Sequence, residues 1–217
     1  MKQKIQKNFV LAVLFIFPVV IYLFFASGKN NFAKLPVLTY GINDLSKFKT
    51  HDGGSIELDN HITILCYWGS NLDIRKGDAF NLNQKIYKRF YKFKDFQFVV
   101  LLTYDQDEKI DNLKESLSSG AGTDLIKWRF LKGSKELISE HFNSLNTSIN
   151  LDSLYSTKYV FIIDRKKNLR GRDDDEDIGF LYGYNAQSVA EINNKMEDDV
   201  KVILAEYRLA LKKYSLR

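Results

Sequence analysis

Residues 61–90 read HITILCYWGSNLDIRKGDAFNLNQKIYKRF, and this stretch decides the fold. Residues 62–68 are almost all apolar or β-branched, which predicts a strand buried on both faces of a sheet. Gly69 and Ser70 end the run, because these residues suit tight turns. Apolar positions then recur at helical spacing over residues 78–90. The stretch therefore predicts a strand, a loop and a helix, an arrangement in which backbone N–H groups point into the loop.

That loop is the place where α/β proteins of this kind carry their chemistry, and here residues 69–77 read GSNLDIRKG. The segment contains no cysteine, no histidine and no glycine-rich phosphate cradle. The sequence thus places a site at this loop without the residue types that would make it a redox, metal or phosphate centre.

Further elements follow in order along the chain. Residues 96–102 predict a second buried strand, so that the two strands and the helix between them form a right-handed parallel unit. Residues 48–58 predict a hairpin that turns at Gly53 and Gly54, and Ser134 is the expected N-cap of a helix. The whole pattern predicts an α/β, thioredoxin-like mixed β-sheet flanked by helices. Its remaining expected elements are helices at 105–119, 135–142 and 188–212, a strand at 159–164 and a return strand from 169.

The N-terminus predicts a membrane anchor. Lysines at positions 2, 4 and 7 precede an uncharged run over residues 9–27, interrupted only by Pro18. A run of about 20 apolar residues spans a bilayer core, and the positive flank indicates that the N-terminus stays in the cytoplasm. A cleaved signal peptide ending near Ala26 is the alternative. We therefore expect a cytoplasmic basic tip and transmembrane helix over 1–28, a tether over 29–45, and a thioredoxin-like domain over 46–217 exported to the periplasm from the inner membrane.

Composition excludes several classes of function. The 217 residues carry a net charge of +5 without a basic stripe or a known nucleic-acid motif, so no nucleic-acid partner is expected. One cysteine excludes an intramolecular disulfide and a dithiol centre. Three histidines and two methionines leave few ligands for a soft metal. We expect no cofactor and no catalytic residue, and hence no enzyme.

Three segments resemble the Sco/SenC family of membrane-anchored copper chaperones, which belongs to the thioredoxin-like superfamily. They are residues 71–76 (NLDIRK), 128–136 (WRFLKGSKE) and 156–164 (STKYVFIID). The resemblance covers about residues 45–213 and implies the fold, the anchor and a role in the cell envelope. It also implies that Asn71 and Arg75 stand at the two cysteine positions of the family and Ser156 at its copper-binding histidine, so that the family's copper and thiol activities do not carry over.

The candidate site is therefore a degenerate active-site loop made of Asn71, Asp73, Arg75, Lys76 and Ser156. Arg75 and Lys76 together are candidates to receive an anionic group of a partner. Asp78 stands where a carboxylate stabilises a helix N-terminus, with no function required. Cys66 lies inside the predicted strand, and we interpret it as a core residue, because a reactive thiol needs exposure and a lowered pKa.

A second candidate is the acidic run at Asp173, Asp174, Asp175 and Asp177. Oxygen ligands of this kind suit hard cations, but the spacing does not match a calcium-binding loop. A solvated hairpin tip is the simpler interpretation, and a docking patch stays open. His51, His61 and His141 share no short spacing, so each is expected to be a lone histidine at or near the surface.

The leading hypothesis is a membrane-anchored, exported thioredoxin-like domain without a redox or copper centre. It would act as a non-catalytic binding or assembly factor for a protein partner in the envelope, with respiratory-complex biogenesis as the setting that the resemblance implies. The alternative is a residual copper chaperone or thiol-redox protein that uses Cys66 with an altered ligand set.

Overall fold

The structure, a computed structural model, describes the backbone of residues 2–27, 34–70, 72–121 and 124–215 and the side chains of residues 9–25, 34–70, 72–120 and 124–208. Contacts divide the chain into two compact units, Met1–Ala33 and Lys34–Arg217.

The first unit contains one helix, α1 (Lys2–Ser27), with Pro18 inside it. Its described side chains, residues 9–25, are exposed. In the part of the chain that the structure describes, no helix is long and apolar enough to cross a membrane. The membrane anchor expected from the sequence is not supported by this finding and stays a prediction.

The second unit is built on a sheet in the order β1-β7-β6-β3-β4-β5-β2, with β10 paired to β6. β3 and β4 run parallel at its centre, and every residue of both strands is buried. β6 lies antiparallel to β3 on the other side. The strands are β1 (Val37–Thr39), β2 (Lys49–Thr50), β3 (Ile62–Gly69), β4 (Phe96–Thr103), β5 (Trp128–Gly133), β6 (Tyr159–Ile163), β7 (Leu169–Arg170) and β10 (Tyr184–Asn185).

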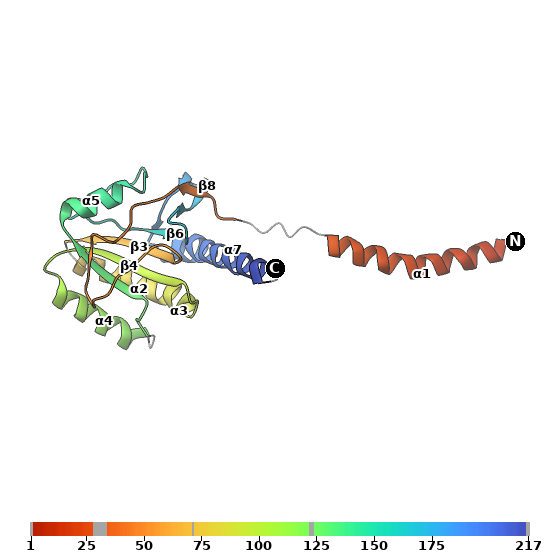
Figure 1. Cartoon of the computed structure of the whole chain (residues 1–217), viewed down its shortest axis with the longest axis horizontal. Helices are drawn as coiled ribbons and strands as arrows, with labels where there is room; N and C mark the ends of the chain where they lie inside the picture. Colours follow the sequence, from red (N-terminus) through yellow and green to blue (C-terminus); the bar gives the residue numbers. More distant parts are fainter. Residues whose placement is uncertain (1, 28–33, 71, 122–123, 216–217) are drawn as a thin grey trace. The chain divides into compact units, whose positions relative to one another are not determined.

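Helices cover both faces of this sheet. One face packs on α4 and on two long helices over residues 76–90 and 189–215, each of which contains a π turn. The other face packs on α5 and on loop residues. Figure 1 shows α5 above the sheet strands and α2 and α4 below them. The expected thioredoxin-like mixed sheet flanked by helices is confirmed. The helical segments are α2 (Lys76–Leu82), η2 (Asn83–Tyr87), α3 (Lys88–Phe90), α4 (Asp107–Ala121), α5 (Lys135–Asn143), α6 (Val189–Glu191), η3 (Ile192–Met196) and α7 (Glu197–Ser215).

Two sequence predictions differ from the structure. The hairpin expected over residues 48–58 is not formed, because β2 pairs with β5 and residues 55–58 contain no strand. The domain also begins earlier than residue 46: β1 pairs with β7, and Ile42 and Leu45 are buried in the core. Of the expected tether over 29–45, residues 29–33 lie outside the described part, and 34–45 belong to the domain.

Candidate functional site

The candidate site lies where β3 ends. Gly69 has a φ of +56°, a left-handed conformation that glycine adopts without strain. The chain then forms a 3₁₀ turn, η1 (Leu72–Arg75), and continues directly into α2. Asn71, one of the predicted site residues, lies outside the described residues.

Arg75 is the centre of the site, and its side chain is only 8% exposed. Its Nε donates to the hydroxyl of Ser156 at 2.8 Å. Its Nη1 donates to Asp78 Oδ2 at 3.2 Å and its Nη2 to Asp152 Oδ2 at 3.4 Å. We call these four residues the Arg75 network. The structure thus brings together two residues that are 81 positions apart in the sequence, Arg75 and Ser156, and that the resemblance placed at a cysteine and a histidine position.

Burial sets the electrostatics of this network. Asp78 is buried, and loss of hydration raises the pKa of its carboxyl group, while the positive charge of Arg75 opposes that rise. The pKa of the Cys66 thiol is raised well above its usual value, chiefly by burial and further by the negative charge of Asp78. Cys66 is fully buried within β3, which confirms its interpretation as a core residue. A thiol with a raised pKa carries little of the reactive thiolate.

The loop before β6 closes over the network. Asp152 Oδ1 accepts hydrogen bonds from the backbone N–H groups of Leu154 and Ser156, at 2.9 and 3.0 Å. The N–H of Ser70 donates to the carbonyl oxygen of Leu154 at 2.9 Å. A Cβ atom on Gly69 would lie 2.0 Å from that same oxygen, so only glycine fits here. The site loop and the loop before β6 are therefore packed backbone against backbone.

The other predicted loop residues lie on the surface. Asp73 forms ion pairs with Lys76 at 3.2 Å and with Lys109 at 3.0 Å, both side chains being more than 40% exposed. These lysines hold the pKa of the Asp73 carboxyl group below its usual value. Both cations of the candidate anion site therefore already have carboxylate partners: Arg75 pairs with Asp78 and Asp152, and Lys76 pairs with Asp73.

These residues do not fit a soft metal ion. A guanidinium group is positively charged and has no lone pair to donate, and a serine hydroxyl is a hard ligand. In the described part of the chain, no group of three or more histidine, cysteine, aspartate or glutamate residues is arranged to hold a metal ion.

The acidic run lies on a separate hairpin, β8 (Arg172–Asp175) with β9 (Gly179–Leu181). Lys195 binds two of its carboxylates, Asp175 at 2.7 Å and Asp177 at 2.6 Å. Asp175 is buried, whereas Asp173 and Asp174 are exposed. Half of the predicted cation or docking loop therefore serves to fix the hairpin onto the C-terminal helix.

The histidine prediction is wrong for His141, which is buried. Its Nδ1 lies 2.7 Å from the hydroxyl of Tyr67, and burial lowers the pKa of the imidazole to about 4. His51 is nearly buried between Asp107 and Asp111, with nitrogen to oxygen distances of 2.7 and 2.9 Å. Its partners are distant in sequence, so spacing gave no signal for this cluster.

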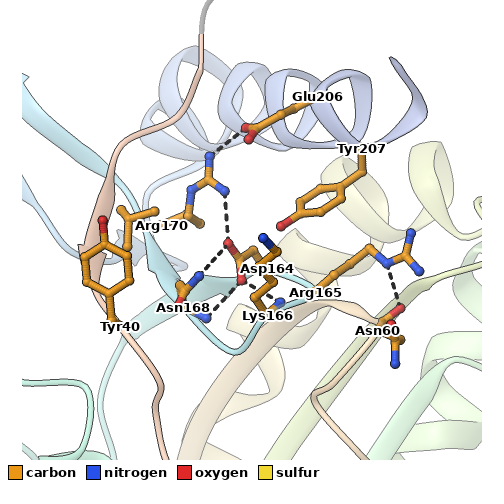
Figure 2. A pocket seen from close by; sticks show the side chains of 10 residues that line it. Tyr40, Asn60, Asp164, Arg165, Lys166, Asn168, Arg170, Glu206 and Tyr207 are labelled. Carbon is orange, nitrogen blue, oxygen red and sulfur yellow. Dashed lines mark hydrogen bonds and ion pairs between the residues drawn. The ribbon is translucent and has the colours of Figure 1, made fainter. Parts of the chain in front are cut away.

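Sequence reasoning also missed a cavity of about 670 Å³ at the opposite end of the sheet. Figure 2 shows Arg170 in its wall, joined to Asp164 at 3.0 Å and to Glu206 at 2.6 Å. Arg165 and Tyr207 lie at its edge. The only sequence signal for it was Asp164 at the end of a predicted strand, and its partners come from β7 and α7.

No protein-family model matches the chain, and no curated protein matches it. Several solved structures, in contrast, match this chain. BsSco, a member of the Sco family of cytochrome c oxidase assembly proteins, is 13% identical over 77% of this chain and 94% of its own, with a TM-score of 0.49. ScoI from Arabidopsis thaliana, with copper bound, is 17% identical over 75% and 98%, with a TM-score of 0.44. A thioredoxin-family thiol:disulfide interchange protein from Chlorobium tepidum TLS is 17% identical over 79% and 99%, with a TM-score of 0.46. Sco-family structures, the group that the sequence resembles, are among these matches.

Proposed function

We propose that this protein is a membrane-anchored, exported thioredoxin-like domain that acts as a non-catalytic binding or assembly factor in the cell envelope. The observation that carries the proposal is the Arg75 network. At the end of β3, in the loop where the resemblance would place a reactive centre, a guanidinium group is hydrogen-bonded to one hydroxyl and two carboxylates. Such a group stabilises the loop and offers neither a thiolate nor a metal ligand.

The anchoring part of the proposal is supported by the N-terminal sequence. Lysines flank an uncharged run, and that run lies in a continuous 26-residue helix. Exposed apolar side chains over residues 9–25 are what a lipid-facing helix presents. The positive flank favours a cytoplasmic N-terminus, an inner-membrane location and a periplasmic domain.

The assembly part is supported by the resemblance to the Sco/SenC family. BsSco is described as belonging to a family of cytochrome c oxidase assembly proteins. A domain that keeps this fold and replaces its ligands retains surface for a protein partner. We extend the proposal to respiratory-complex biogenesis on that ground.

Photo-crosslinking of the full chain in its native membrane tests the proposal. One crosslinker replaces Ile74, which is 55% exposed on the site loop, and a second replaces Ile126, which is 65% exposed before β5. We expect a reproducible protein adduct from position 74 and a weaker one from position 126. The absence of a reproducible adduct from either position would contradict a binding function.

A further inference from the structure

A second surface lies at the end of the domain opposite the Arg75 network. Two cavities of about 670 and 470 Å³ adjoin there, and they share Arg165 and Tyr207 as lining residues. Their rims carry exposed aromatic rings, with Tyr40 76% and Phe93 38% exposed. We call this surface the tether-side face, and it is made of Tyr40, Phe93, Lys94, Arg165, Lys166, Tyr207 and Arg208.

The acidic groups that line this face all lie in ion pairs, and two of them share one arginine. Asp164 and Glu206 both bind the buried guanidinium of Arg170, as Figure 2 shows. Asp95 lies 3.5 Å from Arg165. Burial and the charge of Asp164 raise the pKa of Tyr207 to about 12, so its hydroxyl stays uncharged.

Three cations at the rim, in contrast, lie outside these ion pairs. Lys94, Lys166 and Arg208 are exposed, and among the described residues none of the three has a carboxylate within ion-pair distance. Arg165 stacks over the ring of Tyr207 at 5.7 Å. The face therefore presents excess positive charge next to exposed aromatic rings, a combination typical of proteins at a lipid headgroup layer.

The chain also enters the domain at this face. The carbonyl oxygen of Leu35 accepts hydrogen bonds from Arg170, and that of Pro36 accepts one from the N–H of Gly171. Lys34, the first described residue of the domain, is seven positions after Ser27, the last residue of α1. Seven residues span at most about 25 Å. If α1 crosses the membrane as proposed above, the entry point of the domain stays close to the headgroups.

We propose that the tether-side face docks on anionic phospholipid headgroups of the membrane that holds the anchor. Lys94, Lys166 and Arg208 would contact phosphate oxygens, while Phe93 and Tyr40 enter the interfacial layer. The inference rests on the anchoring part of the proposed function. It leaves the Arg75 network, at the other end of the sheet, turned toward a protein partner.

Fluorescence of the full chain in lipid vesicles tests this docking. Trp68 and Trp128 are both buried and give a constant background. A Phe93→Trp variant reports on the tether-side face, and an Ile74→Trp variant reports on the opposite end. Each is reconstituted with brominated phosphatidylcholine, alone or mixed with phosphatidylglycerol. We expect at least about twofold stronger quenching of the position 93 signal with phosphatidylglycerol, and no such change at position 74.

Charge reversal gives the matched control. Lys94→Glu with Lys166→Glu in the Phe93→Trp chain should abolish the effect of phosphatidylglycerol. Lys49→Glu with Lys135→Glu changes the net charge equally at exposed positions on other elements and should leave the effect intact. Added salt should weaken the quenching difference, because screening shortens the reach of these charges.

Flotation of the same vesicles separates the two proposals. A chain that does not float with vesicles overturns both the anchor and the docking. A chain that floats but shows equal quenching with both lipid mixtures overturns the docking alone. The partner of the tether-side face would then be an acidic protein surface.

Discussion

Arg75 shows at the scale of one residue how the site is held. Removing a guanidinium and a carboxylate from water is costly, and the ion pair is tolerated only where further hydrogen bonds complete it. Ser156 and Asp152 supply those bonds here. The network therefore depends on all its members, and removing the cation leaves Asp78 buried without its opposite charge.

Replacing Arg75 with methionine tests this dependence. We expect Arg75→Met to lower the free energy of unfolding by about 3 kcal/mol, because one partner of a buried ion pair is removed. Lys76→Met, at the next position, alters an exposed pair and should change stability by no measurable amount. Urea unfolding of both variants provides the measurement, and equal stability of the two would contradict the structural role of Arg75.

Cys66 gives a second prediction at this scale. The thiol is fully buried and the pKa is raised, so a thiol reagent at neutral pH should label it only after denaturation. The measurement compares labelling rates in buffer and in denaturant by mass spectrometry. Rapid labelling of the folded chain would support the thiol-redox alternative.

His141 predicts a pH dependence of stability. Burial lowers the imidazole pKa from 6.5 to about 4 in the folded state. Between these values the unfolded chain binds more protons, so stability falls as the pH falls through this window. The loss amounts to about 3 kcal/mol when complete. Between about pH 7.5 and about pH 4, the free energy of unfolding of the His141→Gln variant should fall by about 3 kcal/mol less than that of the wild type. An identical pH profile in both proteins would contradict the assignment.

At the scale of elements, the buried strands were predictable and the edge pairing was not. β3, β4 and β6 are short, continuous apolar runs, and the sequence pattern of such a run predicts a strand buried in the centre of a sheet. The expected hairpin at 48–58 is absent although Gly53 and Gly54 both take the positive φ that a tight hairpin turn needs, because β2 pairs with β5 and residues 55–58 form no strand. A two-residue edge strand such as β2 pairs with whichever strand lies beside it, and the sequence of the edge strand does not specify that neighbour.

The turn after β3 gives a prediction for an element. Gly69→Ala places a methyl group against the carbonyl of Leu154 and forces a left-handed conformation on alanine. We expect a loss of at least about 2 kcal/mol in unfolding free energy. Gly77→Ala is the matched control, since a Cβ there meets nothing within 4 Å and lies in α2. It should stabilise the chain by up to about 1 kcal/mol. Thermal unfolding of the two variants should shift in opposite directions.

At the scale of the whole molecule, the sequence was sufficient for the order of the central strands and helices, but not for the edge strands or for the contacts within the candidate site. Local periodicity predicts strands and helices, and their order predicts the sheet. The contact of Arg75 with Ser156 joins residues 81 positions apart, so no local pattern contains it. The burial of His141 against Tyr67 was missed for the same reason. The tether-side face is assembled from several distant segments and left no motif.

A Cu(I) titration of the full chain against a competing chelator tests the central claim most directly. The chain is compared with its Cys66→Ser variant under reducing conditions. We expect neither protein to withdraw copper from the chelator, because Arg75 and Ser156, which the resemblance places at ligand positions, present a guanidinium and a hydroxyl, and the thiol is buried in β3. Stoichiometric binding that disappears in the Cys66→Ser variant would contradict it and establish a copper site with a different ligand set.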